Sequence, residues 1–544
     1  MRSRTELLLL VACCAFLLFY GLGSFGLLGA DEPRYAQVAR EMLNRGDWVT
    51  PTLNGKPWLE KPPLYYWQAM LSYRIARSLS PTTDGVTEQT ARLPGAIDAA
   101  LMIAAIYLFL RRRKPNDERP SIELDAALIT ASSAGIIGFA HAASTDMPLT
   151  ATFTIAMLAW YAWYESRRKS NLAIFYLCLA LGALAKGPIA PALAAVIVIL
   201  FAVAKRDWKL IPHTLWLPGI ALFFAVALPW YIAVQLRNPD FFRVFILEHN
   251  LARFSTNVYH HPQPFWFYIP VFLLAAMPWA IWLILAVIER LRLIWHERSE
   301  AFTSSEDSWA LFLLLWMILP ILFFSLSQSK LPGYILPAVP ASALLVAEYL
   351  ADRREQHSRI SFPAAVAHAV SCGILIFAAL SAASLAYTHH LTLAPGIRFA
   401  AAVSLIFAVG IAAALAMRSA LQMLRPVTML AAILSVAAVI RLAAPAIDAT
   451  QSAHPIAETI QQFSREPVPV ALYHVGRTPQ YGLDFYLNRE TQTYDTGQIP
   501  AEAHLLVAAA TTGTEFTTLI PGRKVSYLTS LPARKLQLYW IGKK

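Results

Sequence analysis

The chain has 544 residues, of which 57% are hydrophobic, and its formal net charge at pH 7 is +11. Soluble domains contain roughly 45–50% apolar residues, whereas this sequence has a mean hydropathy of +0.48. Its composition therefore excludes an ordinary soluble protein and predicts an all-α polytopic membrane protein. Nucleic-acid binding is disfavoured, since the basic residues lie between the apolar runs, as expected of a membrane topology signal.

Apolar runs recur along the chain at about the length that crosses the hydrocarbon core of a bilayer. They predict about thirteen transmembrane helices, near residues 8–28, 91–110, 124–140, 147–164, 172–185, 188–204, 212–235, 266–289, 309–326, 331–350, 364–387, 397–417 and 427–446. Arginine and lysine gather in alternate connections, such as 111–114 and 353–359. By the positive-inside rule these connections face the cytoplasm, and the other loops face outward.

The first apolar run has an alternative interpretation as a cleaved signal peptide. Arg2 and Arg4 precede it, and the small residues Gly29 and Ala30 follow it, which is the order found in signal sequences. Its length of about twenty residues favours a span instead. The four cysteines of the chain all lie within predicted spans, so we expect no disulfide or cysteine-based metal site in the outer loops.

The first outward loop, about residues 29–90, opens with the charged segment "GADEPRYAQVAREMLNRGDW". We expect an amphipathic helix along the membrane surface, capped by Asp31, with Pro33 in its first turn and Gly46 at its end. Its apolar stripe repeats at helical spacing and comprises Tyr35, Val38, Ala39, Met42 and Leu43.

A second segment of this loop, "NGKPWLEKPPLYYWQAMLSY", leads through a Pro-Pro step into an aromatic helix. It places Lys61 near a helix N-terminus, where backbone N–H groups already favour an anion. Its aromatic residues are expected at the depth of the lipid headgroups: Trp58, Tyr65, Tyr66 and Trp67.

Ionisable and aromatic residues recur in the remaining outward loops. They are Asp146, Lys186, Glu248, His249, Arg253, His260, His261, Lys330 and Tyr334. Taken singly, each is explained as a snorkelling or capping residue. Because ionisable groups at span ends cost energy unless they are paired or hydrated, the whole set on one side predicts an outward-facing cavity. Such a cavity offers cations for a phosphate and carboxylates for a base or an amine contact.

The sequence changes character after about residue 447. "HPIAETIQQF" is predicted as a helix, and the short β-prone runs that follow are "VPVALYHV", "LDFYLN", "HLLVAAA", "KVSYLTS" and "LQLYWIG". We therefore expect a small extracytoplasmic α/β domain over 448–544, after a transmembrane domain over 1–447. The tail contains neither a glycine-rich phosphate loop nor a cluster of metal ligands, so support or regulation is its expected role.

A set of motifs carries a resemblance to a known family. "DEPRYAQVAREMLNRGDWVTPTLNGKPWLEKPPLYYW", with "AKGP", "EHNLARF", "HPQPFWFY" and "SKLPGYILP", strongly resembles the membrane glycosyltransferases of the GT-C superfamily that use polyprenyl-phosphate sugars. The likeness extends over nearly the whole chain and is closest to the bacterial aminoarabinose transferases. Protein O-mannosyltransferases are more distant relatives.

The resemblance implies an acidic residue near the reacting centre at the start of the first outer loop, here Asp31, and a second at Asp146. It also implies that the later loop motifs line the site. The matching positions are Arg34, Tyr35, Glu60, Lys61, Lys186, Glu248, His249, Arg253, His261, Lys330 and Tyr334. Trp58 departs from the tyrosine expected in the aminoarabinose transferases.

The chemistry of a polyprenyl-phosphate donor can be considered from the residues themselves. The departing phosphate gains negative charge and needs cations, for which the candidates are Arg34, Lys61, Arg253 and Lys330. If the acceptor is a hydroxyl group, a carboxylate must take its proton, with Asp31 as first choice and Asp146 as second. If the acceptor is a phosphate of lipid A, the nucleophile is already anionic, and Asp31 with Glu32 would hold the sugar and its amine.

Glu60, His249 and His261 have the chemistry of a Zn²⁺ site, although ordinary hydrogen-bonded histidines are the alternative. No cofactor is required by the sequence. The expected function is transfer of 4-amino-4-deoxy-L-arabinose from undecaprenyl phosphate to lipid A, on the outer side of the bacterial inner membrane. Alternatives are transfer of another polyprenyl-phosphate sugar, such as mannose, to a protein or glycan, and a lipid or solute transporter. A transporter would show internal repeats and charges at mid-membrane.

Overall fold

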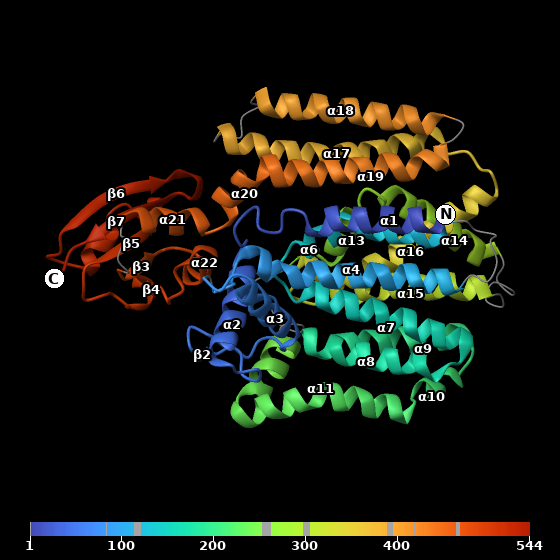
Figure 1. Cartoon of the computed structure of the whole chain (residues 1–544), viewed down its shortest axis with the longest axis horizontal. Helices are drawn as coiled ribbons and strands as arrows, with labels where there is room; N and C mark the ends of the chain where they lie inside the picture. The colour runs from blue at the N-terminus through green and yellow to red at the C-terminus, as the bar shows by residue number, and fades with distance from the viewer. Residues whose placement is uncertain are drawn as a thin grey trace.

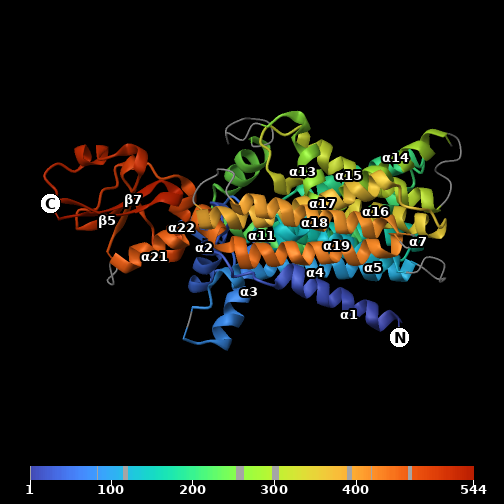
Figure 2. The same ribbon diagram turned by 90° about the horizontal axis from the view of Figure 1, so that it is seen from above.

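The computed structural model describes residues 2–543 apart from 83, 114–120, 253–262, 297–304, 389–394, 418–419 and 464–467. A bundle of long helices occupies one end of the molecule and a small β-sheet the other (Figure 1). The first outer loop lies between them, and the N-terminus lies at the end of the bundle that is remote from the sheet. Both views show this order along the long axis (Figure 2).

The bundle consists of long helices joined by shorter helical segments. In chain order these are α1 (Arg2–Cys14), η1 (Ala15–Phe19), α4 (Glu88–Arg113), α5 (Ile122–Ser132), α6 (Ala134–Ala140), α7 (Asp146–Ser166), α8 (Lys169–Lys186), α9 (Ile189–Ala204), α10 (Leu210–Thr214), α11 (Leu217–Arg237), η2 (Arg243–Ala252), η3 (Phe265–Phe267), α13 (Tyr268–Ala275), α14 (Ala280–His296), α15 (Ser305–Ser325), η4 (Pro332–Ala338), α16 (Val339–Glu355), α17 (Phe362–Thr388), α18 (Pro395–Ala416), α19 (Ala420–Ala438), η5 (Val439–Ala443) and α20 (Ala444–Gln451).

Eight helices within the described residues are long and apolar enough to cross a membrane, or up to ten if each of two bent pairs is one span. The bent pairs are α5 with α6, at 62°, and the helix over Phe265–Ala275 with α14, at 116°. The predicted apolar runs fall largely in helical segments, although residues 20–28 of the first run are not helical. The count of thirteen spans is not confirmed. The segment α1–η1 and helices α7 and α9 are outside the set, and α9 has only 16 residues. The chain is a multi-pass membrane protein.

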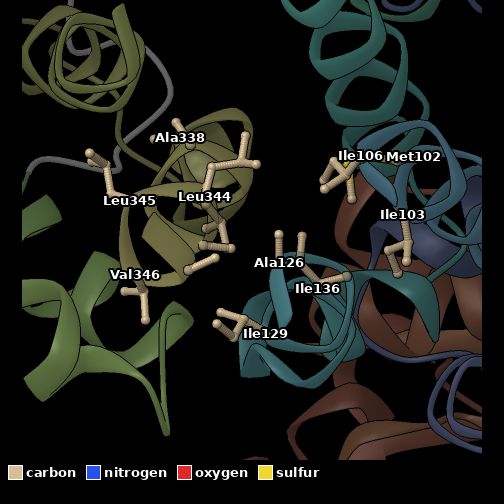
Figure 3. Close-up of a cluster of buried hydrophobic side chains, with 14 of the residues drawn as sticks. Met102, Ile103, Ile106, Ala126, Ile129, Ile136, Ala338, Leu344, Leu345 and Val346 are labelled. Carbon is tan, nitrogen blue, oxygen red and sulfur yellow. The ribbon is translucent and has the colours of Figure 1, made fainter. Parts of the chain in front are cut away.

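The core of the bundle combines small and branched apolar side chains with large aromatic ones such as Trp160 and Trp316. Helix α16 is buried at nearly every position between Val339 and Ala351. Figure 3 shows side chains from α16, such as Leu344, close to those of α5, such as Ala126 and Ile129, with Met102 and Ile106 of α4 beyond. Small residues let helices approach closely where lipid supplies no hydrophobic driving force between them.

The first outer loop forms α2 (Asp31–Arg45), a two-stranded hairpin of β1 (Thr52–Leu53) and β2 (Lys56–Pro57), and α3 (Leu64–Leu79). Gly46 ends α2 with φ of +63°, as predicted, but Ala30 rather than Asp31 is the N-cap. The apolar stripe of α2 packs against α3 rather than facing a membrane. Tyr65 and Tyr66 are fully buried there, so their rings contact the protein rather than lipid headgroups. Burial between two helices removes these large rings from water on all sides.

The tail forms α21 (His454–Phe463), α22 (Arg477–Leu487) and a five-stranded mixed sheet. The strands are β3 (Val470–Tyr473), β4 (Gln492–Thr493), β5 (His504–Ala509), β6 (Val525–Leu531) and β7 (Leu536–Ile541), in the order β4-β3-β5-β7-β6. Strands β3, β4 and β5 are parallel, and β7 is antiparallel to both β5 and β6. The α/β class is confirmed, but "LDFYLN" is not a strand. It ends helix α22, with Asn488 in the left-handed conformation as the C-cap.

Candidate active site

A cavity of about 430 Å³ lies where the first outer loop meets the ends of the bundle helices. Its polar lining comes from four separate parts of the chain and consists of Glu60, Lys61, Lys186, His249, Ser327 and Tyr334. Its apolar lining consists of Pro188, Ile189, Ala192, Phe245, Ile246, Phe323 and Phe324. The cavity therefore combines two lysines with an apolar wall, which suits a phosphate attached to a hydrocarbon chain.

The cavity end of α8 is tied to the start of α7 by an ion pair between Lys186 and Asp146. Both side chains are largely buried, and the Lys186 ammonium also lies 4.7 Å from the centre of the Tyr334 ring. Gly333 lets the chain pass this carboxylate, because a Cβ atom there would lie 2.9 Å from Cγ of Asp146. Two sequence-predicted residues, Lys186 and Tyr334, are thus brought together at the cavity, with Asp146 directly behind.

A second ion pair joins Asp31 and Arg34, one turn apart at the start of α2. The Asp31 side chain is 55% exposed and that of Arg34 only 12%. The Arg34 guanidinium lies 4.8 Å from the Trp58 ring and 5.3 Å from the Tyr481 ring. Burial acts to lower the pKa of Arg34, but Tyr35, Asp31 and Glu60 together raise it. Arg34 is therefore a fixed cation that holds an accessible carboxylate.

Electrostatic contacts connect this pair to the cavity. Arg34 interacts with Glu60, which lines the cavity, as well as with Asp31. Tyr35 is buried beside them and is influenced by both Asp31 and Asp146, which with burial raise its pKa well above the ordinary value. Both predicted carboxylates, Asp31 and Asp146, are therefore near enough to influence the same buried tyrosine.

Glu60 and His249 are neighbours in the lining of the cavity, with Oε1 3.6 Å from Nε2. Two ligands of a tetrahedral zinc ion, each about 2.0–2.1 Å from the metal, lie roughly 3.3 Å apart, so this pair fits the chemistry of two metal ligands. The third predicted ligand, His261, lies outside the described residues, as do His260 and Arg253. Among the residues that the structure describes, no group of three or more metal-binding side chains is found.

Glu32 has a different environment from its neighbour Asp31. It is 8% exposed and accepts hydrogen bonds from Arg92 at 2.8 Å and from the backbone N–H of Leu28 at 3.0 Å. The fully buried Arg92 also donates to three carbonyl oxygens, those of Leu22, Phe25 and Gly26. This network anchors the start of α2. The structure therefore places Glu32 in a supporting position rather than at an accessible face.

Arg92 is absent from the set of residues predicted from sequence. The sequence nevertheless contained a signal for it, since Arg92 lies within a predicted apolar run. Ionisable residues in membrane spans are almost always paired, so such an arginine indicates a buried partner. The aromatic wall of Phe245, Phe323 and Phe324 carries no such signal, since phenylalanines are ordinary in apolar runs.

Two further predicted residues have other partners. Lys330 does not line the cavity, and its ammonium donates to the carbonyl oxygens of Ser327 at 2.6 Å and Gln263 at 3.1 Å. Burial lowers the pKa of this amine. Glu248 pairs with Arg243 on η2. Both residues shape segments that border the cavity, and Lys330 stays a predicted phosphate ligand without a structural contact to support it.

The tail packs directly on the first outer loop. Arg40 donates to the carbonyl oxygen of Phe485 at 2.8 Å, and Asn54 donates to Asp484 at 3.0 Å. Tyr481 from the same helix, α22, lies against Arg34. The tail therefore contributes to the position of α2 and of the Asp31–Arg34 pair.

Parts of the sequence match a known family and known proteins. Residues 4–245 match the dolichyl-phosphate-mannose-protein mannosyltransferase family. The undecaprenyl phosphate-alpha-4-amino-4-deoxy-L-arabinose arabinosyl transferase of Pseudomonas aeruginosa (strain UCBPP-PA14) is 35% identical over 360 residues, 65% of this chain and 60% of that protein. A transferase of the same description from Pseudomonas fluorescens (strain Pf0-1), numbered 2, is 33% identical over 357 residues, again 65% and 60%. The chain thus matches about 60% of the length of these relatives.

Solved structures share the fold. ArnT from Cupriavidus metallidurans bound to undecaprenyl phosphate superimposes with a TM-score of 0.75 at 22% identity, over 98% of this chain and 97% of that chain. The oligosaccharyltransferase of Archaeoglobus fulgidus gives a TM-score of 0.52 at 13% identity, over 95% and 71%. These structures confirm the predicted fold, and the predicted resemblance to polyprenyl-phosphate-sugar transferases is confirmed by the sequence matches.

Proposed function

We propose that this protein is a glycosyltransferase that moves 4-amino-4-deoxy-L-arabinose from undecaprenyl phosphate to lipid A. The observation that carries the proposal is the cavity in which Lys61 and Lys186 lie beside an aromatic wall, next to the Asp31–Arg34 pair. The named relatives are described as transferases of this sugar from this lipid, at 33–35% identity.

The lysines and the aromatic wall are suited to the two parts of the donor. Lys61 and Lys186 supply positive charge to a phosphate, and Phe245 and Phe323 supply apolar surface to the first isoprene units of the lipid. When the bond between the anomeric carbon and the phosphate oxygen breaks, the undecaprenyl phosphate departs with the bonding electron pair. Fixed cations near this oxygen lower the barrier because they are oriented before the charge develops.

Asp31 is the carboxylate that is accessible to the acceptor. Its side chain is the more exposed member of the Asp31–Arg34 pair. If the acceptor is a hydroxyl group, its oxygen forms the new bond to the anomeric carbon and its proton passes to Asp31. If the acceptor is a phosphate, no proton is removed, and Asp31 instead orients the sugar through its hydroxyl groups or its ammonium.

Glu60 and His249 are the residues that would hold a divalent ion. Such an ion would supply positive charge to phosphate oxygens when bound. Without it, this pair contributes a carboxylate and an imidazole to the cavity wall near Lys61. Elemental analysis of the purified protein and of its Glu60→Gln variant tests whether Glu60 and His249 hold a zinc ion. Stoichiometric zinc that the variant loses supports it, and equal zinc content in both proteins contradicts it.

We also propose that the cavity faces the periplasm. Helices that reach the cavity carry their arginines at the opposite end, as α8 does with Arg167 and Arg168 before it and α16 does with Arg353 and Arg354. The positive-inside rule assigns that opposite end to the cytoplasm. Cysteines introduced singly at the exposed positions Lys56 and Arg168, in a variant whose four native cysteines are replaced, should label oppositely with a membrane-impermeant reagent.

The alternative acceptor is a protein or another glycan. The match of residues 4–245 to a family of protein mannosyltransferases favours keeping it. A polyprenyl-phosphate donor is common to both proposals, so the same cavity serves either reaction.

Mass spectrometry of lipid A distinguishes them. The lipid A is taken from a bacterial strain that lacks its own aminoarabinose transferase. The strain expresses either this protein, its Asp31→Ala variant or its Glu502→Ala variant. Glu502 is an exposed carboxylate in the tail, so its variant is the control. A mass gain of one aminoarabinose with the chain and the control, but not with Asp31→Ala, supports the proposal. Unchanged lipid A with inserted, folded protein contradicts the aminoarabinose assignment and directs attention to other acceptors.

A further inference from the structure

A second, larger cavity lies at the end of the bundle opposite the candidate active site. Its volume is about 870 Å³, and it is bordered by α1, by the end of α16, by the end of α18 and by the start of α19. Its basic lining includes Arg354, Arg359 and Arg425. Its apolar lining includes Leu9 and Met417, which are 43% and 50% exposed. The cavity therefore opens on the apolar outer surface of the bundle and has a basic floor.

The floor is organised by a buried carboxylate. Asp125 on α5 is only 4% exposed at its side chain, and it pairs with both Arg354 and Arg425. Arg425 uses Nε and Nη2 in this contact, and Arg354 uses Nη1. Each of the two guanidinium groups has further N–H donors beyond those that contact Asp125. These donors can form hydrogen bonds with a ligand in the cavity.

The charges do not cancel. Three guanidinium groups in the cavity face two carboxylates, Asp125 behind the floor and Glu6 on α1, and Glu6 also accepts a hydrogen bond from Ser121. Within the described residues, Arg359 has no acidic partner. Among the described residues of this cavity, the arginines therefore outnumber the carboxylates by one, which suits the single negative charge of a phosphodiester.

We propose that this cavity binds the headgroup of an anionic phospholipid, with its acyl chains along the exposed apolar surface of α1 and α18. Two features favour a lipid over a soluble phosphate ester. The walls above the arginines are apolar and exposed, and the cavity lies at the bundle end where basic pockets between membrane helices meet anionic headgroups. The proposal needs only that the helices span a membrane, so it is independent of the proposed transferase activity.

Native mass spectrometry of the full-length protein in detergent tests this proposal. The protein is incubated with phosphatidylglycerol or phosphatidylcholine of the same acyl chains, and the retained lipid is counted. We expect preferential retention of phosphatidylglycerol. Arg359→Gln, at an exposed position, should weaken that retention about fivefold, the usual contribution of one arginine near a headgroup. It should leave phosphatidylcholine unchanged.

Two other variants keep the result interpretable. Gln422→Glu adds a negative charge at an exposed lining position and should also weaken retention of phosphatidylglycerol. Arg112→Gln removes an exposed arginine at the same end of the bundle but outside the cavity, and should change nothing. Equal retention of the two lipids by the unmodified protein overturns the proposal. So does an equal effect of Arg112→Gln, which would indicate general surface charge, or full competition by glycerol phosphate, which would indicate a soluble ligand.

Discussion

The two ends of the helical bundle use acidic residues in opposite ways. At the end that holds the candidate active site, Asp31 is 55% exposed and, within the described part of the chain, forms an ion pair with Arg34 on its own helix. At the other end, Asp125 is 4% exposed and has two partners, Arg354 and Arg425, on two other helices. A buried carboxylate with two cations has little freedom to meet a ligand and connects helices. An exposed one with a single cation is available for chemistry, so exposure separates the two roles where residue type does not.

The largest effect that this comparison predicts is on catalysis at Asp31. If Asp31 takes the proton of a hydroxyl acceptor, Asp31→Asn should lower the turnover rate at least about 100-fold, since a positioned acid or base contributes roughly 10²–10⁴. If Asp31 instead holds the ammonium group of the sugar, the loss of that charged hydrogen bond, about 1.5–3 kcal/mol, should lower the rate roughly 10–100-fold. The midpoint of thermal unfolding should change little, because the side chain is exposed. The measurement is transfer of labelled sugar by purified protein, with unfolding followed in parallel. A normal rate with intact fold would remove Asp31 from the reaction.

The opposite result is expected for Asp125. Asp125→Asn leaves two arginines without their shared carboxylate, and breaking a buried ion pair costs about 3–5 kcal/mol. The protein should unfold at a markedly lower temperature, while the turnover of the remaining folded molecules stays close to normal. Thermal unfolding in detergent and activity per folded molecule measure the two quantities. An unchanged unfolding midpoint would contradict the structural role assigned to Asp125.

Lys61 tests the cation side of the active-site cavity. Lys61→Met keeps much of the apolar stem but removes the charge. The loss of one charged hydrogen bond to phosphate, about 1.5–3 kcal/mol, corresponds to roughly 10–100-fold in kcat/KM. The matched control is Lys56→Met, an exposed lysine of the same loop outside the cavity lining. If both variants lose activity equally, the loss results from the lower positive charge of the first outer loop and not from a lost contact between Lys61 and the donor phosphate.

The sequence predicted which residues meet at the cavity, but it did not predict the surroundings of each side chain. Lys61, Lys186, His249 and Tyr334 come from distant motifs, and topology alone placed them at the same end of the bundle. Asp31 and Glu32 could not be separated in this way, because successive helical residues point about 100° apart and the buried direction depends on packing. Only the structure shows that Glu32 turns toward Arg92.

The same limit explains the errors in the fold. The stripe of α2 is amphipathic whether it faces a membrane or another helix, and α3 is the partner. "LDFYLN" is apolar enough for a strand, but Leu483 and Phe485 are buried on α22, where the helix packs on α21 and α2. Periodicity identifies a buried face without naming what covers it.

The smallest predicted effect concerns the junction between the bundle and the tail. His454 Nδ1 lies 3.2 Å from a carboxylate oxygen of Asp448, and Nε2 lies 3.6 Å from Glu458. The hydrogen bond to Asp448 raises the pKa of His454 above its ordinary value of 6.5, against the effect of burial, with Glu458 and Glu88 also raising it. The protonated imidazole therefore stabilises the folded state.

Because the folded-state pKa is the higher one, this stabilisation is fully present below about pH 6.5. It is lost as the pH rises through the folded-state value. Since the side chain is 36% exposed, the contribution should stay below about 1 kcal/mol. The unfolding midpoint should fall slightly more between pH 6 and pH 8 for the unmodified protein than for His454→Gln. An identical pH dependence in both proteins would show that the junction is held by other contacts, such as the hydrogen bond from Tyr486 to Glu88.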